Sequence, residues 1–153
     1  MTNKRVAYVV YLTVSVVLFV LANVGLGVLS RMTIGGESYD YALSRYIYYA
    51  REQLLGTMLL LSPFLLLGCM AAGFSIKRSV VHGSTVFVVG AVLLLVLYYK
   101  GYMDSEIAIK NRHWTAAALS VGLLPFQGLG VLALLLIGGL VARRRKNAKT
   151  PIR

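Results

Sequence analysis

Four side chains that could do chemistry lie close together in the second half of the chain. Asp104 and Glu106 are followed by Arg112 and His113 in the segment "KNRHW". An arginine, a histidine and a carboxylate that converge could bind an anion or transfer a proton. The alternative, which we favour, is a solvated loop beside an interfacial tryptophan, Trp114.

The rest of the sequence gives catalysis little support. The only other histidine, His82, lies near the start of a different apolar run, and the single cysteine, Cys69, allows no internal disulfide. The sequence contains no cluster with metal-ligand spacing and no glycine-rich phosphate loop. We therefore expect a protein that is not an enzyme and that needs no metal and no cofactor.

The segment "YDYALSRYIYYAREQ", residues 39–53, holds five tyrosines and four charges. Its apolar residues recur with the period of a helix along one face, which predicts an amphipathic helix leading into the next apolar run. Gly35 and Gly36 break the chain before it, and Ser38 is the expected N-cap. The tyrosines and arginines of this helix have the composition of a protein-contact surface. The candidate partner-binding residues are Tyr41, Arg45, Tyr48, Tyr49, Arg51 and Glu52.

An aromatic belt is the other interpretation of these tyrosines. Tyrosine is enriched at membrane–water interfaces because its ring is apolar and its hydroxyl group favours water. Such a belt accounts well for Tyr98 and Tyr99, at the end of an apolar run. It accounts less well for tyrosines on both faces of one helix.

The elements that must position these residues are membrane spans. Hydrophobic residues make up 58% of the chain and charged residues 14%, against roughly 45–50% and about 25% in soluble proteins. A span needs about 20 residues of helix, and runs of this length without Asp, Glu, Lys or Arg occur four times. We predict an all-α bundle of four transmembrane helices forming one membrane domain over residues 1–153. The spans are expected at about 6–29, 54–76, 80–99 and 114–141.

The basic residues predict the orientation of the bundle. The N-terminus, the loop after the second span and the tail at 142–153 carry ten basic residues and no acidic ones. The outer loops, at 30–53 and 100–113, carry the other six basic residues and all five acidic ones. The positive-inside rule then places both termini in the cytoplasm, in what we expect to be a bacterial inner membrane. Because the charges flank apolar runs, the net charge of +11 is not expected to mean a nucleic-acid partner.

The first apolar run also has features of a cleavable signal peptide. The residues "VLA", ending at Ala22, resemble a small-residue cleavage site. The run continues past them as "NVGLGVL", so we expect an uncleaved anchor.

Polar and kinked positions inside the spans suggest a second candidate site. Pro63 and Pro125 fall at similar depth in the second and fourth spans, and Gln127 lies beside Pro125. Paired kinks could open a midplane site with freed carbonyl groups. The alternative is that neighbouring helices absorb the kinks and that Gln127 bonds another helix. The spans hold no acidic or basic residue apart from His82, which argues against proton-coupled transport.

The size, orientation, uncharged spans and aromatic outer loop resemble bacterial immunity proteins that guard the inner membrane against pore-forming toxins. This resemblance covers the architecture of the chain and no motif, so it transfers no residue roles. It implies a non-enzymatic interaction protein in the lipid bilayer, with a protein partner on the extracytoplasmic side. The alternatives are a small oligomeric channel or transporter with a midplane layer, and an accessory subunit of a larger membrane complex. Small residues at four-residue spacing are compatible with a homo-oligomer.

Overall fold

The computed structural model describes the backbone of residues 2–148 and the side chains of residues 5–138. This part of the chain consists of helices joined by short connections. In order they are α1 (Thr2–Ser30), the π-helical turn η1 (Arg31–Gly35), α2 (Tyr39–Glu52), α3 (Leu54–Lys77), α4 (Val80–Lys110), α5 (Trp114–Gly122) and α6 (Leu124–Ala148).

Four helical stretches are long and apolar enough to cross a membrane, which confirms the predicted all-helical class and the number of spans. They are Arg5–Gly35, Leu54–Lys77, Val80–Lys110 and Trp114–Gly138. A helix is the expected form, because lipid offers no partner for backbone amides and a helix satisfies them internally.

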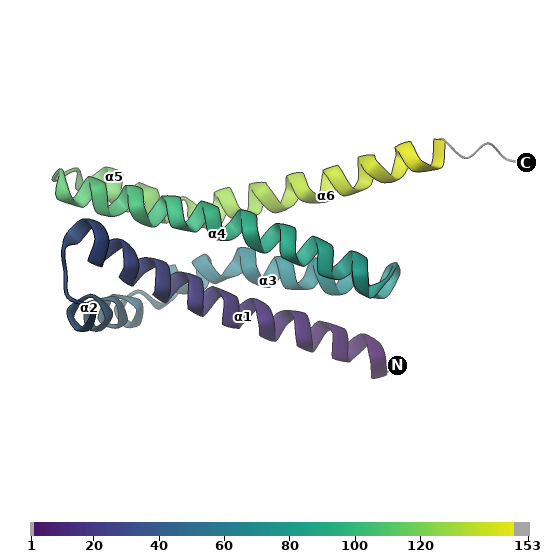
Figure 1. Ribbon diagram of the computed structural model, residues 1–153, viewed down its shortest axis with the longest axis horizontal. Helices are drawn as coiled ribbons and strands as arrows, with labels where there is room; N and C mark the ends of the chain where they lie inside the picture. Colours follow the sequence, from purple (N-terminus) through teal and green to yellow (C-terminus); the bar gives the residue numbers. More distant parts are fainter. Residues whose placement is uncertain (1, 149–153) are drawn as a thin grey trace, which may run out of the picture.

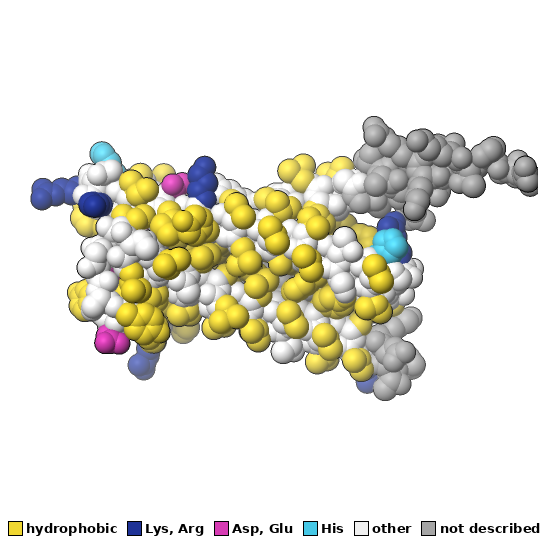
Figure 2. All heavy atoms as spheres, viewed as in Figure 1, with side chains coloured by type: hydrophobic (Ala, Val, Ile, Leu, Met, Phe, Trp, Pro, Cys, Tyr) yellow, Lys and Arg dark blue, Asp and Glu magenta, His cyan; other side chains and the backbone are white. Residues whose placement is uncertain are grey.

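The long helices lie side by side, so that the start of α1 and the end of α6 are at one end of the bundle (Figure 1). The turn η1, helix α2 and the start of α5 are at the other end, which we call the α2 end. Figure 1 shows α2 nearly end-on, lying across the direction of the long helices. Charged side chains gather toward the two ends, and hydrophobic side chains cover the face between them (Figure 2).

The boundaries differ from prediction in the third span. Helix α4 continues to Lys110, so most of the predicted outer loop at 100–113 is helix. Only residues 111–113 connect it to α5, and Arg112 there has a φ of 62°, a conformation that non-glycine residues adopt in tight turns. The charged residues after position 99 therefore continue the helix instead of ending it.

The predicted fourth span, 114–141, is two helices. The break falls at Leu123, directly before α6 with Pro125 near its start. Proline cannot donate to the carbonyl four residues earlier, and it disfavours a helical residue before it. α5 and α6 meet at an angle in Figure 1, which is the expected kink. Helix α6 continues to Ala148, and the side chains of the predicted basic tail at 142–153 lie outside the described residues.

Pro63, by contrast, lies inside α3 without ending it. The carbonyl group of Leu59, which Pro63 leaves without its helical donor, accepts a hydrogen bond from the Ser62 hydroxyl group at 2.7 Å. The next carbonyl, that of Leu60, accepts from the hydroxyl group of Tyr98 at 2.6 Å. The kink is thus absorbed by neighbouring groups and does not expose a row of free carbonyls.

Glycines allow the helices to approach closely. A Cβ atom at Gly68 would lie 2.6 Å from the Ser15 hydroxyl of α1, and one at Gly128 of α6 would lie 2.9 Å from the Pro63 ring. Lipid is as apolar as a leucine side chain, so helix association depends on such tight packing and on hydrogen bonds.

Two tyrosines that fall on the predicted outer side belong to the core. Tyr98, which we predicted in an aromatic belt, is fully buried and packs edge-on against Phe64, with ring centroids 5.1 Å apart. Tyr102 is 8% exposed, and its hydroxyl group donates to the side-chain oxygen of Asn23, which is also buried. The belt interpretation is wrong for Tyr98, because its hydroxyl group finds a backbone acceptor within the bundle. Tyr99, next to it, is exposed.

Candidate functional site

The candidate site lies at the α2 end and begins with the turn that reverses the chain after α1. The helix widens into the π-helical turn η1 and ends at Gly36, whose φ of 70° is in the left-handed region that favours glycine. The amide groups of Gly36 and Glu37 both donate to the carbonyl group of Arg31. Ser38 is the N-cap residue of α2, as predicted, although its side chain makes no capping hydrogen bond.

The inner face of α2 packs onto the bundle through small and aromatic residues. Ala42 is fully buried, and the ring of Tyr46 lies over Gly27 of α1 so closely that a Cβ atom there would be 2.7 Å from it. Burial raises the pKa of the Tyr46 hydroxyl group to about 12. At Gln53 the backbone leaves the helical conformation, with φ −114° and ψ 53°, which separates α2 from α3.

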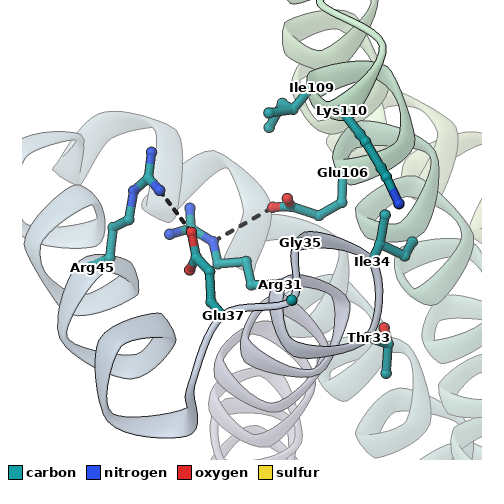
Figure 3. Close-up of a pocket in the computed structure, with 10 residues that line it drawn as sticks. Arg31, Thr33, Ile34, Gly35, Glu37, Arg45, Glu106, Ile109 and Lys110 are labelled. Atoms are coloured by element: carbon teal, nitrogen blue, oxygen red, sulfur yellow. Dashed lines mark hydrogen bonds and ion pairs between the residues drawn. The ribbon is translucent and has the colours of Figure 1, made fainter.

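Charged residues from three elements meet beside this contact. Arg31 of η1 pairs with Glu106 of α4, with Nε and Oε1 3.5 Å apart. Arg45 of α2 pairs with Glu37, with Nη1 and Oε1 2.7 Å apart. Figure 3 shows the two pairs next to each other, with Arg31 between the two carboxylates. We call these four residues the charge cluster.

Tyr49 joins the cluster through its ring. The guanidinium carbons of Arg31 and Arg45 lie 5.6 and 5.8 Å from the ring centroid, within the range of cation–π attraction. Tyr49 and the carboxylate of Glu37 raise the pKa of Arg45. Arginine is charged in any case, so the effect of these contacts is to attract and orient its guanidinium group.

Two polar atoms of the cluster are buried without a hydrogen-bond partner among the described residues: Nη1 of Arg31 and Oε2 of Glu37. The side chains are 17% and 18% exposed. The unpaired nitrogen is a donor and the unpaired oxygen an acceptor, and leaving either unsatisfied costs free energy.

Two cavities meet at the charge cluster. The polar one has a volume of about 520 Å³ and is lined mainly by η1, the cluster and Lys110. The other is a mostly apolar groove of about 560 Å³ between α2, α3, α4 and α5 that extends to Pro125. Arg31, Arg45, Glu106 and Ile109 line both.

The predicted partner-binding residues divide into two groups. Tyr41 and Tyr48 are 57% and 62% exposed, and Arg51 and Glu52 are also exposed. Arg45 and Tyr49 are exposed as well, and they make the cluster contacts described above. Part of the predicted face is therefore engaged in contacts within the α2 end.

The predicted arginine–histidine–carboxylate set does not converge. Glu106 turns toward Arg31, while Asp104, Arg112 and His113 are exposed and form no hydrogen bond or ion pair with one another through their described side chains. Among the described residues, no group of three or more His, Cys, Asp or Glu could hold a metal ion.

The predicted midplane layer is also divided. Pro63 and Pro125 are buried, and Pro63 packs against the α6 backbone at Gly128. Gln127 lies on the exposed face of α6 and forms no hydrogen bond with another helix through the described side chains. The helix that Gln127 is expected to bond is therefore not among the described helices of this chain, and that expectation stays a prediction for a helix outside it.

The charge cluster itself was not predicted. Its sequence signals are Arg31, placed directly after an uncharged run, and Glu106, which is followed by the apolar residues Ile107 and Ala108. Comparison of the chain with protein-family models, with curated proteins and with solved structures found no match in any of the three. The interpretation of the site therefore depends on its geometry.

Proposed function

We propose that this is a non-enzymatic membrane protein that acts through a protein contact at the α2 end. The observation that supports this is the outer face of α2. Tyr41 and Tyr48 are more than half exposed, beside the exposed charges of Arg51 and Glu52. Tyrosine and arginine are enriched in protein interfaces.

The packing of α2 supports a docking role further. Its inner face is held by Ala42, Tyr46 and the charge cluster, so the outer face is presented on a helix of fixed orientation. A rigid surface loses little entropy when it binds. With the orientation that the basic residues predict, this face lies outside the cytoplasm, where a secreted partner can reach it.

The finer proposal is that the partner is a membrane-permeabilising protein and that this chain protects against it. The support is architectural: four apolar helices and an exposed aromatic, charged surface at one end.

A photo-reactive residue at Tyr48 tests the protein contact in living cells. We expect one distinct protein to be captured there and not at Val88, which is 58% exposed in the apolar middle of α4. Arg51→Glu should abolish the same adduct, because it reverses a charge of the docking face. The charge cluster should stay intact in this variant, since Arg51 makes no ion pair with a described residue. Capture at both positions, or at neither, would contradict a docking face on α2.

The captured protein then tests the finer proposal. Added to vesicles, it should release an enclosed dye, and vesicles that contain this chain should release less. If the captured protein releases no dye, protection is the wrong role, although the docking face stands.

The exposed position of Gln127 favours a second candidate, assembly within the membrane. A polar side chain on an apolar helix face gains by hydrogen bonding to another helix. That helix could belong to a second copy, which fits the oligomeric channel or transporter, or to a larger complex, which fits the accessory subunit. Photo-crosslinking at Gln127 separates them: self-adducts support the first, a different membrane protein the second, and no adduct contradicts both.

A further inference from the structure

The two cavities at the α2 end are neighbours, because four residues line both of them. The apolar groove is lined by the side chains of Leu60, Ala117 and Val121. It extends to Pro125 at one end and to Arg31 at the other. Each cavity is within the range of about 300–1,000 Å³ that holds small ligands. Because they share four lining residues, a ligand could occupy both, with a polar group in one and a hydrocarbon chain in the other.

The groove opens toward the apolar exterior of the bundle. Leu59 of α3 is 55% exposed at its edge, and Ala118 and Gly122 of α5 are exposed on the other side. Helix α5 packs mainly on α4, which leaves the space between α5 and the first turns of α3. A hydrocarbon chain could therefore enter sideways from the bilayer.

The polar end has one hydrogen-bond donor and one acceptor without partners among the described residues. Nη1 of Arg31 lacks an acceptor and Oε2 of Glu37 lacks a donor among the described residues, while Nε of Arg31 pairs with Glu106 and Oε1 of Glu37 with Arg45. With Lys110, the polar cavity contains three cationic and two anionic side chains (Figure 3). Phosphate oxygens accept hydrogen bonds from guanidinium groups, and a primary ammonium group donates to a carboxylate.

We propose that this site binds one phospholipid whose headgroup carries a phosphate and a primary ammonium group, as in phosphatidylethanolamine. The phosphate accepts from Arg31, the ammonium donates to Glu37, and one acyl chain lies in the groove toward Pro125. A choline headgroup has no N–H to offer Glu37, and a glycerol headgroup has no cation for it. The site is separate from the outer face of α2, so it does not depend on the proposed function.

Native mass spectrometry of the full chain in detergent tests the specificity. Delipidated protein is mixed with equal amounts of phosphatidylethanolamine, phosphatidylcholine and phosphatidylglycerol. We expect a single bound lipid with at least about tenfold preference for phosphatidylethanolamine over phosphatidylcholine, the ratio that one hydrogen bond to a charged group gives. Glu37→Gln should reduce this preference to near unity, whereas Arg31→Gln should weaken binding of all three lipids.

Glu52→Gln is the matched control, because Glu52 is an exposed carboxylate on α2 that lines neither cavity. It should leave the preference unchanged, and circular dichroism should show the same helix content in all variants. Equal binding of the three lipids to the unaltered chain would overturn the proposal. Equal binding of phosphatidylethanolamine and phosphatidylglycerol, both above phosphatidylcholine, would overturn the assignment of the ammonium group to Glu37.

The chain's single tryptophan provides an independent test of the acyl chain, because Trp114 lines the groove. Brominated acyl chains quench tryptophan fluorescence on contact. At one brominated phosphatidylethanolamine per protein, we expect quenching in the unaltered chain and in Glu52→Gln. Ala118→Phe, which fills the groove, should reduce it severalfold while leaving the helix content unchanged. Equal quenching in Ala118→Phe would contradict the position of the acyl chain.

Discussion

Gly27→Leu should release α2 from the bundle. A Cβ atom at Gly27 would lie 2.7 and 2.9 Å from two ring carbons of Tyr46, closer than carbon atoms pack, and leucine adds three more carbons in that direction. The ring must leave its position. Losing the burial of an aromatic side chain costs about 1.5–3 kcal/mol, which increases the open population of α2 about 10- to 100-fold.

Hydrogen exchange of the α2 amides measures this opening directly, because local exchange reports local free energy. We expect exchange within residues 42–50 to accelerate by that factor, while exchange in the middle of α4 stays the same. Gly25→Leu is the matched control on the same helix, since nothing lies within 4 Å of a Cβ atom at Gly25. Equal exchange rates in the two variants would refute the view that the contact between Tyr46 and Gly27 holds α2 in place.

Three further predictions concern packing, a buried hydrogen bond and pH. Gly128→Ala should lower the free energy of unfolding in detergent by about 1–3 kcal/mol, because the ring of Pro63 on α3 is too rigid to move aside. Gly130→Ala is the control: nothing lies within 4 Å of a Cβ atom there, so this change should be neutral or stabilising. Tyr102→Phe should cost about 1–3 kcal/mol in a thermal or denaturant assay, because it leaves the buried side-chain oxygen of Asn23 without its donor; no loss of stability would contradict that hydrogen bond. The pKa of Tyr46 is about 12 when folded, against 10.0 for a free tyrosine, so its contribution to stability is complete below pH 10 and is lost as the pH rises through 12. Tyr46→Phe should therefore flatten the fall of stability over this interval, and an unchanged pH profile would contradict the burial of the hydroxyl group.

The helices could be predicted from the sequence because their signals are local. Uncharged runs of sufficient length must be helical in lipid, and the segment at 39–53 has a helical period of its own. The chemistry of proline predicts a kink at Pro125 as it does at Pro63, although only the kink before Pro125 divides a helix. Each of these inferences needs only the residues of the element itself.

The end of α4 could not be predicted in the same way. The charges after Tyr99 indicated a loop, since charged residues leave the hydrocarbon region. A helix can leave it too, however, and at the α2 end Glu106 has Arg31 as a partner 75 positions earlier in the chain. Nothing local in either segment specifies that pairing, because it depends on how α1 packs beside α4.

Which tyrosines are buried is the other feature that could not be predicted from local sequence patterns. A tyrosine at the end of an apolar run satisfies its hydroxyl group equally well in water or on a buried acceptor. Tyr98 donates to the carbonyl of Leu60, one turn from Pro63, and Tyr102 donates to Asn23, whereas Tyr99 is exposed and donates to no described residue. Burial was decided by acceptors on α1 and α3, which the sequence around the tyrosines does not contain.

The concentration of tyrosines and charges at the α2 end thus serves two purposes, which composition alone does not separate. Tyr46 and Tyr49 face inward or toward the charge cluster, so changing them alters the position of α2 itself. Tyr48 faces outward, and its ring makes an edge-on contact with that of the neighbouring Tyr49, with centroids 5.7 Å apart. The same division applies to the arginines: a reversal at Arg45 breaks the 2.7 Å pair with Glu37 as well as any external contact, whereas a reversal at Arg51 affects only the external one. A loss of partner binding in Arg45→Glu is therefore ambiguous, and the same loss in Arg51→Glu is evidence for a docking face.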